Sequence, residues 1–290
     1  MSRSPVTGRR VILTADDFGL AVAVNEAVEE AHRRGVLTAA SLMVGAAAAG
    51  DAVERARRLP TLRVGLHVVL VQGRPTLPPA RVPDLVDERG DFTDRLVRAG
   101  FAYFFRPGVR RQLEDEIRAQ YEAFRATGLP LDHVNAHNHM HLHPTLLALI
   151  LAVGRDYGLR AVRVPCEPPL ASYRAARSGL AGRLATAAGM APWIALLRRR
   201  LRRAGLKSNR FVFGLNDSGN MTAELLGRMV GELPAGVTEI YFHPATGSSP
   251  ELDRQMPGYH HQAELAALTA PAIGDALRAA GIRRIAFCDL

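Results

Sequence analysis

Short apolar segments alternate with segments of helical periodicity along almost the whole chain, and this alternation restricts the fold more than any other feature of the sequence. The strand candidates are residues 10–15, 39–44, 64–70, 133–139, 161–165, 239–243 and 283–288. Strands that alternate with helices form parallel sheets with helical crossovers. Seven strand candidates are more than most small doubly wound sheets contain, but this number suits a barrel. We therefore expect an α/β fold, a TIM-like (β/α) barrel that is seven-stranded or incompletely closed.

Two segments interrupt this alternation, at about residues 72–108 and 168–210. We expect both to be long loop insertions at strand ends, where such loops serve as lids or binding walls, or as surface elaboration. The sequence has no internal repeat and no low-complexity linker that would mark a domain boundary. Residues 1–290 are therefore expected to form a single barrel domain.

The net charge of +9 comes from one segment of the chain. Ten basic residues and no acidic one lie between Glu167 and Asp217, and removing those ten from the 37 basic residues leaves 27 against 28 acidic. Apolar side chains interleave with the arginines of residues 174–210, so we expect a cationic surface that contacts an anionic membrane, or a solvated helical lid. Nucleic acid is not an expected partner, because no stacking platform or recognition motif accompanies the charge.

Other features of the sequence bear on location. No apolar run approaches the roughly 18 residues of a membrane span, and the first residues lack the apolar region of a signal peptide. The two cysteines form no CxxC pair, which suits a reducing compartment. We expect a cytoplasmic protein, in peripheral contact with the inner membrane surface if the basic segment binds lipid.

The stretch DHVNAHNHMHLHP, residues 132–144, holds five of the ten histidines, all at odd positions. In an extended strand, an odd-numbered set points to one face. We therefore expect a face of imidazoles opposite an apolar face. Neutral imidazole is the commonest metal ligand, so this face is a candidate metal site, with a polar strand end of solvated or core histidines as the alternative.

Three more strand ends carry candidate functional residues. Asp16 and Asp17 run out of the first strand into a glycine turn, where paired carboxylates can divide metal binding and general base catalysis between them. His67 lies in the third apolar strand, and His243 ends the strand at 239–243. One carboxylate and two imidazoles with open positions form the usual catalytic divalent-metal site. Asp17, His67 and a member of the histidine cluster could supply that set.

Four motifs together resemble the YdjC-like carbohydrate deacetylase family: ADDFG with Asn25 downstream, GLH, the H-x-H-x-H-x-x-P array and FHPA. The resemblance spans nearly the whole chain in the right order, and HVNAHNHMHLHP is similar to the branch associated with hopanoid biosynthesis, the HpnK-like proteins. It implies a TIM-like barrel and a divalent cation held by Asp17, His67 and His137. Relatives read Asp-Ser where this chain has Asn135-Ala136, which removes a carboxylate near the metal.

The resemblance implies metal-assisted removal of the N-acetyl group from an acetylated amino sugar, plausibly on an N-acetylglucosaminyl lipid (hopanoid) intermediate. Asp16 would be the base and His243 the acid, with His139 and His141 as rivals for the acid; His139, His141 and Asn135 are candidate substrate-binding residues. The cation would be zinc or magnesium, with manganese, cobalt or iron as further candidates. The alternatives are another metal-dependent amide or ester hydrolase acting on carbohydrate, and a basic nucleic-acid-binding protein. The sequence leaves the oligomeric state open.

Overall fold

The computed structural model describes residues 8–94, 100, 103–104 and 106–290. The strands are β1 (Arg9–Phe18), β2 (Ala39–Leu42), β3 (Arg63–Val68), β4 (Val134–Ala136), β5 (Phe211–Phe213), β6 (Gly236–Phe242) and β7 (Arg283–Arg284). The α-helices are α1 (Val22–Arg34), α2 (Ala49–Arg57), α4 (Pro107–Ala126), α5 (Pro144–Gly154), α6 (Pro169–Ala176), α7 (Leu180–Arg203), α8 (Ala223–Glu232), α9 (Pro250–Gln255), α10 (His261–Thr269) and α11 (Pro271–Ala279). The short 3₁₀ helices are η1 (Pro79–Arg81), η2 (His137–Leu142), η3 (Arg155–Tyr157) and η4 (Phe287–Asp289).

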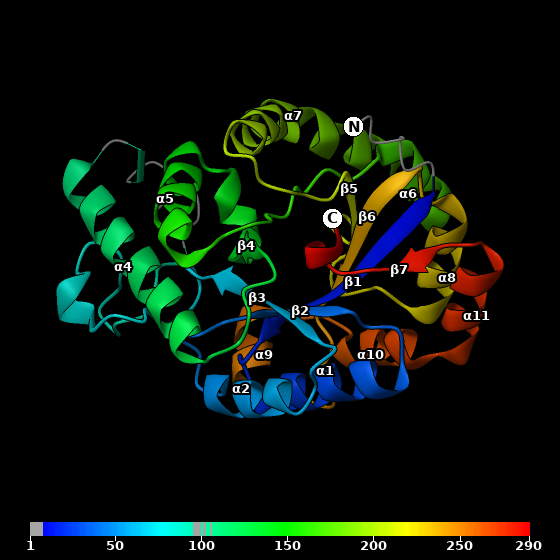
Figure 1. Ribbon diagram of the computed structural model, residues 1–290, viewed down its shortest axis with the longest axis horizontal. Coiled ribbons are helices and arrows are strands. Elements are labelled where there is room, and N and C mark those ends of the chain that lie inside the picture. Colours follow the sequence, from blue (N-terminus) through cyan, green and yellow to red (C-terminus); the bar gives the residue numbers. More distant parts are fainter. Residues whose placement is uncertain (1–7, 95–99, 101–102, 105) are drawn as a thin grey trace.

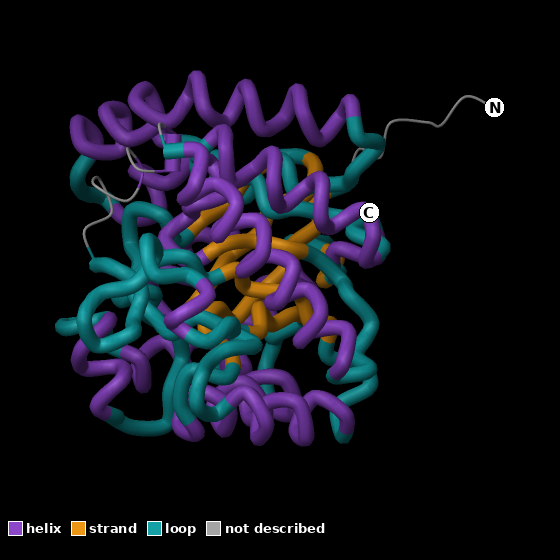
Figure 2. The backbone as a smooth tube through the Cα atoms, turned by 90° about the vertical axis from the view of Figure 1, so that its left-hand side faces the viewer, coloured by secondary structure: helices purple, strands orange, loops and turns teal. Residues whose placement is uncertain are grey.

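All strand pairs are parallel, in the order β4-β3-β2-β1-β6-β5, with β7 against β1. The helices surround this curled sheet: α1 and α2 lie on one side, α7 on the opposite side, and α4 and α5 at one flank (Figure 1). The view from that flank shows the strands at the centre of the molecule, with helices and loops around them (Figure 2). The prediction of an α/β fold with a curled, TIM-like parallel sheet is confirmed.

Residues 161–166 connect the two edges of the curled sheet. On one side, the Val134 N–H of β4 donates to the carbonyl of Ala161 at 3.0 Å. On the other, the Val212 N–H of β5 donates to the carbonyl of Cys166 at 3.0 Å. Backbone hydrogen bonds therefore continue around the barrel where no regular strand lies.

The strand predicted at 161–165 is wrong in detail, because this segment makes only isolated bridges at Ala161 and Val162. The Val164 N–H donates to the Asn209 side chain instead of to a strand, and Pro165 has no N–H to donate. A seventh strand, β5, lies instead just after the basic segment, where its three residues were too short a pattern to predict.

The two predicted loop insertions have different structures. The first, residues 72–108, falls partly outside the described residues; its described part is mostly loop, with η1 and the start of α4. The second, residues 168–210, is mainly two helices, α6 and α7, so the loop prediction is wrong there. By length and composition α7 is long and apolar enough to cross a membrane, contrary to the expectation from the sequence that no segment approaches a membrane span, and only 17% of its most apolar window is buried inside the protein.

Side chains of β1 alternate between two packing environments. Val11 and Leu13 belong to the main core, which the helices cover, whereas Ile12 packs in a second cluster with residues of β2, β6 and the C-terminal segment. Further along the same face as Ile12 come Thr14 and Asp16, both buried. The barrel interior therefore changes from apolar to polar toward the C-terminal ends of the strands.

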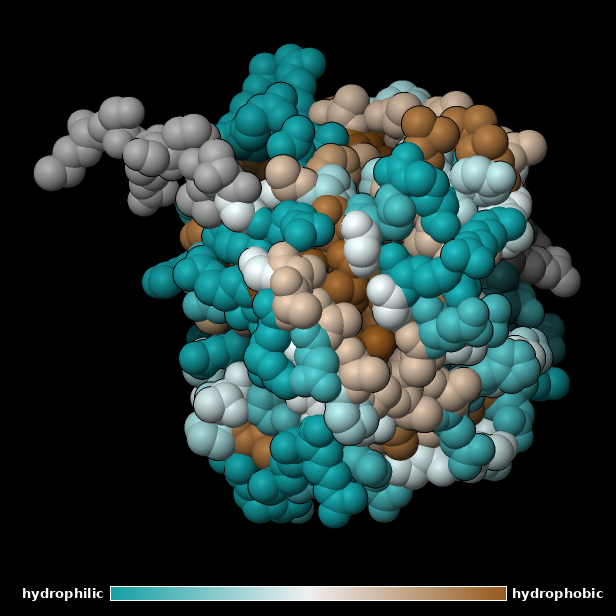
Figure 3. Space-filling model, turned by 90° about the vertical axis from the view of Figure 1, so that its right-hand side faces the viewer, coloured by the Kyte–Doolittle hydropathy of each residue, from teal (hydrophilic) through white to brown (hydrophobic). Residues whose placement is uncertain are grey.

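The outer face that carries α8 and α11 is mostly hydrophilic, with a band of apolar residues through its middle (Figure 3).

Candidate active site

Asp16 and Asp17 are the last acidic residues of β1, and both are buried. Strict alternation would put them on opposite faces of the strand. Asp17, however, has a φ of 60°, and the register between β1 and β2 shifts between Ala15 and Phe18. This irregularity turns the Asp17 carboxylate toward the barrel interior, on the side of β3 and β4.

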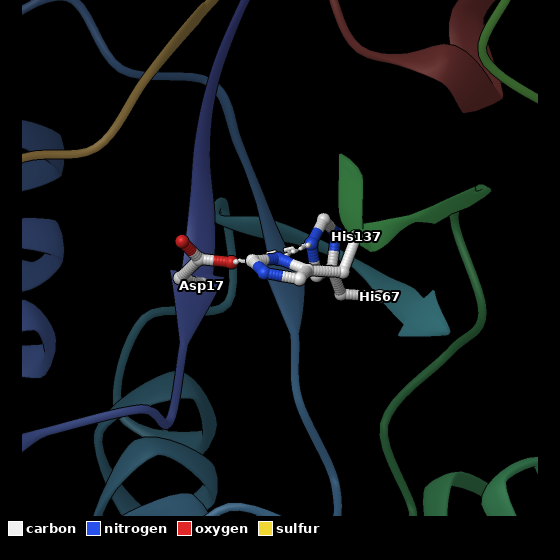
Figure 4. A group of neighbouring side chains, drawn as sticks. All are labelled: Asp17, His67 and His137. Atoms are coloured by element: carbon white, nitrogen blue, oxygen red, sulfur yellow. Dashed lines mark hydrogen bonds and ion pairs between the residues drawn. The ribbon is translucent and has the colours of Figure 1, made fainter. Parts of the chain in front are cut away.

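Asp17, His67 and His137 come together from β1, β3 and the start of η2, with their side chains pointing toward one another (Figure 4). Asp17 Oδ1 lies 3.2 Å from His67 Nε2 and 3.2 Å from His137 Nδ1. The two ring nitrogens are 3.4 Å apart. One ligand atom from each residue falls within 4.8 Å of the others, the grouping predicted as the metal site.

The chemistry of these three residues fits a divalent cation. Asp17 Oδ2 is buried and has no hydrogen-bond partner among the described residues, so a strong acceptor is left for another group. Burial raises the pKa of Asp17, but the neighbouring His137 and His67 outweigh it and hold that pKa well below its usual range. Burial likewise opposes charge on His67, yet the Asp17 hydrogen bond and the Asp16 charge leave its pKa raised. The site thus favours positive charge.

Asp16 sits beside this group in a buried ionic network. Both of its oxygens accept from Arg163, at 2.5 and 3.0 Å. Arg163 is fully buried and also donates twice to Glu239 of β6, at 2.9 and 2.7 Å. Burial raises the pKa of Asp16, but the charges of Arg163 and His67 hold it far below its usual range. Asp16 is therefore a carboxylate throughout the neutral pH range.

Asn135 of β4 joins the two parts of the site. Its Oδ1 lies 2.7 Å from His67 Nδ1, and its amide nitrogen donates to Asp16 and to Ser41, at 3.0 Å each. The residue is fully buried, and all these partners are protein groups. Asn135 is thus placed behind the cation site instead of at a substrate surface.

The histidine-rich segment does not form the predicted strand beyond Ala136. It turns into η2, and Asn138 and His139 both adopt left-handed backbone angles, with φ of 51° and 53°. The predicted face of five parallel imidazoles is therefore wrong. Only His137 of the five reaches the Asp17 group, because the turn sends the later rings elsewhere.

The rings that follow have separate environments. His139 Nε2 lies 3.2 Å from the Tyr241 hydroxyl, and its other ring nitrogen has no partner. His141 has no exposed surface and bonds the Arg163 carbonyl. Burial and the Arg163 charge lower the pKa of His141 to about 3, so the ring is neutral. His139 is thus closer to an open position than His141.

His243 follows β6 and lies between the rings of Tyr241 and Tyr259, at centroid distances of 5.6 and 5.3 Å. Its backbone N–H donates to Glu264, which fixes the segment, while its Nδ1 has no partner. Burial lowers the pKa of His243, against the opposing charges of Asp17 and Asp16. A neutral imidazole therefore faces the two carboxylates.

A cavity of about 320 Å³ opens on the same rim, lined by residues that follow β1, β2 and β3. Its lining includes the apolar side chains of Leu20, Met43 and Val69 and the charged side chains of Arg74 and Asp91. Its volume is at the lower end of the range for ligand pockets.

Sequence reasoning missed Arg163, Glu239 and Tyr241. The sequence did contain a signal for two of them, because Arg163 and Glu239 each place a charged side chain in an otherwise apolar strand candidate. A charged residue at such a position is almost never buried unless it is paired.

Comparison with known proteins places the chain among carbohydrate-active relatives. It is 40% identical over 163 residues to a carbohydrate deacetylase of Brevibacillus brevis, a match that covers 55% of this chain and 59% of the relative. With a carbohydrate deacetylase of Thermoanaerobacter pseudethanolicus it shares 28% identity over 236 residues, 81% of this chain and 80% of the relative. The chain thus matches less than two thirds of the length of the first of these relatives.

Solved structures share the fold. A protein of Enterococcus faecalis, provisionally named as a cellobiose-phosphate cleavage protein, aligns with a TM-score of 0.74 and 26% identity over 97% of this chain and 98% of its own. A lactam utilization protein of Thermus thermophilus aligns at a TM-score of 0.50 and 15% identity, over 96% and 99% of the two chains, which indicates the fold alone. The model of the YdjC-like protein family matches residues 10–279, nearly the whole sequence, and the chain therefore belongs to that family.

Proposed function

We propose that this protein is a metal-dependent hydrolase that removes the N-acetyl group from an acetylated amino sugar, with residues 1–290 acting as one barrel unit. The observation that carries the proposal is the grouping of Asp17, His67 and His137 beside the ionised carboxylate of Asp16, which Arg163 holds in place. Two imidazoles and one carboxylate with open positions form a catalytic cation site. The carbohydrate deacetylases among the relatives support the sugar as substrate.

A divalent cation held by these three residues would act as a Lewis acid and make a neighbouring water more acidic. Asp16 then accepts the proton of the attacking water, because its depressed pKa keeps it deprotonated and Arg163 holds it in place. His243 is our candidate for passing the proton that leaves the water to the departing amine, because its neutral ring can take up that proton at Nδ1, which has no partner among the described residues, and its lowered pKa favours giving the proton away again. Zinc or magnesium is the proposed cation, with manganese, cobalt and iron as alternatives.

The cavity that follows β1, β2 and β3 is the proposed place for a part of the substrate away from the acetyl group, because charged and polar side chains line it but none of the proposed ligands or catalytic residues does. We assign substrate contact to His139, whose Nε2 lies 3.2 Å from the Tyr241 hydroxyl and whose Nδ1 has no partner among the described residues. Asn135 and His141 are fully buried, so we propose that they support the site from behind instead of contacting substrate.

A lipid-linked substrate, such as an N-acetylglucosaminyl hopanoid, is the narrower proposal. It is supported by α6 and α7, which expose Leu170, Leu184 and Trp193 among arginines. Such a surface can rest on an anionic bilayer, which would place a cytoplasmic protein at the inner membrane surface. Co-sedimentation with anionic but not neutral vesicles would support this contact, and equal recovery in both pellets would contradict it.

The test of the proposed function is acetate release after chelation and reloading with a panel of Zn²⁺, Mg²⁺, Mn²⁺, Co²⁺ and Fe²⁺. N-acetylglucosaminyl compounds, with and without a lipid aglycone, are compared with O-acetyl sugar esters. We expect release from the amides that the chelator abolishes and one or more cations restore. Release from the esters alone would favour the esterase alternative, and activity unaffected by the chelator would remove the metal from the proposal.

A further inference from the structure

Behind His67, on the side away from the rim, five buried side chains form one line through the barrel. His67 Nδ1 lies 2.7 Å from Asn135 Oδ1, and the Asn135 amide nitrogen lies 3.0 Å from Ser41 Oγ. Ser41 Oγ lies 3.1 Å from His133 Nε2, and His133 Nδ1 lies 2.9 Å from Asp132 Oδ2. The exposed fraction of these residues ranges from 0% to 6%.

The positions of the protons along this line can be deduced step by step, from His67 at one end to Asp132 at the other. His67 Nε2 faces Asp17 and His137, so a cation there leaves the proton on His67 Nδ1, which donates to Asn135. The Asn135 amide must then donate to Ser41, whose own proton is left for His133 Nε2. His133 consequently carries its proton on Nδ1 and donates it to Asp132. From His67 to Asp132 each donor along this line thus points away from the cation site, while the Asn135 amide nitrogen also donates to Asp16.

The fold makes room for this line. Gly65 of β3 leaves space for the His133 ring, because a Cβ there would lie 2.5 Å from two of its atoms. Phe287 stacks on the other side of that ring, with centroids 4.4 Å apart, and the Cys288 N–H donates to Asp132 Oδ1 at 2.9 Å. Burial raises the pKa of Asp132, but His133 and Cys288 outweigh it and keep that pKa below its usual value. The line therefore ends on a fixed carboxylate.

Ser41, His133 and Asp132 have the order of a nucleophile, a base and an orienting acid. Ser41 and His133, however, have no exposed surface, and Asn135 already donates to the hydroxyl oxygen. An acyl group could not reach that oxygen. The role of the three must therefore be exerted through Asn135 and His67.

We propose that Ser41, His133 and Asp132 are positioning residues that fix the ring of His67 and the amide of Asn135 for cation binding. The proposal rests on the cation site of the proposed function. A ligand histidine that donates its second N–H to a fixed acceptor is held in one tautomer and orientation and is a better ligand. Here the acceptor is an amide, and the line beyond it fixes which way that amide faces.

The first test reads the proton positions without a substrate, in the Zn²⁺-loaded protein, because the cation fixes the proton of His67 on Nδ1. Long-range ¹H–¹⁵N spectra of that protein at neutral pH, assigned with a His133→Gln variant, report which ring nitrogen of His133 carries the proton. We expect His133 to carry it on Nδ1 alone. A proton on Nε2, or on both nitrogens, would overturn the proposed direction of the line.

The second test measures Zn²⁺ affinity by competition with a chromophoric chelator. Ser41→Ala and His133→Gln are expected to weaken binding about tenfold or more, the lower end of the effect of supporting partners. His32→Gln is the matched control, because His32 also uses both ring nitrogens, toward Leu37 and Thr61, but lies apart from the site. Circular dichroism checks folding. If His133→Gln fails to fold, Ser41→Ala decides, since it removes a single oxygen atom.

Unchanged affinity in folded Ser41→Ala would overturn the inference even if the wild-type protein is a deacetylase. Conversely, a wild-type protein that binds Zn²⁺ but releases no acetate would contradict the proposed function, and a tenfold loss in Ser41→Ala would still support the inference. A wild-type protein that binds none of the cations would remove the cation site and the inference together.

Discussion

Asp17 adopts left-handed backbone angles that cost a non-glycine residue on the order of 1–3 kcal/mol. The conformation has a clear consequence, since it lets two consecutive residues of one strand face the same site. Asp16 follows the regular alternation of β1, while Asp17 departs from it and reaches His67 and His137. Because of the strained backbone at Asp17, the proposed base Asp16 and the proposed ligand Asp17 are neighbours in sequence and still contact different partners at one site.

The different roles of the two aspartates predict different effects of the same substitution. Asp16→Asn is expected to lower kcat at least about 100-fold, because the amide cannot take the proton of water, while Zn²⁺ still binds. Asp17→Asn is expected to weaken Zn²⁺ binding itself, because it replaces a ligand carboxylate. Kinetics combined with metal analysis of both variants separates the effects. Near-normal kcat in Asp16→Asn would show that another group is the base.

Arg163 provides a prediction about stability. Arg163→Met leaves Asp16 and Glu239 buried without their partner, which is expected to reduce the free energy of unfolding by about 3–5 kcal/mol. Arg174→Met is the control, because Arg174 pairs with Glu232 at the surface and such pairs contribute at most about 1 kcal/mol. Urea unfolding at neutral pH compares them. Equal small losses would mean that the buried network is not held together by Arg163.

Single residues of the site were more predictable than their partners. Asp16, Asp17, His67 and His243 were singled out as polar groups at the ends of apolar strands, whereas His137 was chosen from five histidines by the family resemblance. The structure brings Asp17, His67 and His137 together, and the roles of all five stay predictions. Arg163 escaped prediction because its role depends on charges 147 and 76 positions away in sequence. Ion pairs between residues so far apart in sequence form only because the curled sheet brings their strands together. No local sequence pattern indicates them.

At the scale of elements, the strand–helix alternation predicted the parallel sheet well, since periodicity reflects burial. The strand prediction failed where a backbone N–H donates to a side chain, as at Val164 with Asn209. It also failed where the chain turns, as at Asn138 and His139 in η2. Pro144 begins α5, because its missing N–H is not needed at that position. Period-two spacing of histidines alone did not distinguish a strand from a tight turn.

The junction of α1 and α10 provides a prediction at this scale. A Cβ on Gly35 would lie 2.1 Å from the carbonyl oxygen of Leu268, so the two helix ends approach as closely as they do only because residue 35 is glycine. Gly35→Ala is expected to lose at least about 1–3 kcal/mol of unfolding free energy. Gly189→Ala, in open space on α7, should be neutral or gain up to about 1 kcal/mol. Thermal melts that rank the two variants in the opposite order would contradict this account of the junction.

At the scale of the whole molecule, buried ionisable groups contribute to stability with opposed pH dependence. His141 has its pKa lowered from 6.5 to about 3, mainly by burial, so unfolding takes up a proton between these values. The contribution of His141 to the free energy of unfolding is therefore fully present above pH 6.5 and is lost as the pH falls toward about 3. Burial instead raises the pKa of Glu264 from 4.5 to about 7, so its contribution is present below 4.5 and is lost as the pH rises toward 7.

These opposite signs predict opposite effects of two substitutions on the pH dependence of folding. His141→Gln removes a group that favours folding at higher pH, so the free energy of unfolding should rise less steeply between about pH 4.5 and 6.5 than in the wild type. Glu264→Gln removes a group that opposes that rise, so the slope should steepen. Each effect is expected on the order of one to several kcal/mol across the window. Urea unfolding at several pH values, with a chelator present so that cation binding adds no pH dependence of its own, measures the slopes. If both variants kept the wild-type slope, the two buried groups would not be titrating as their surroundings require.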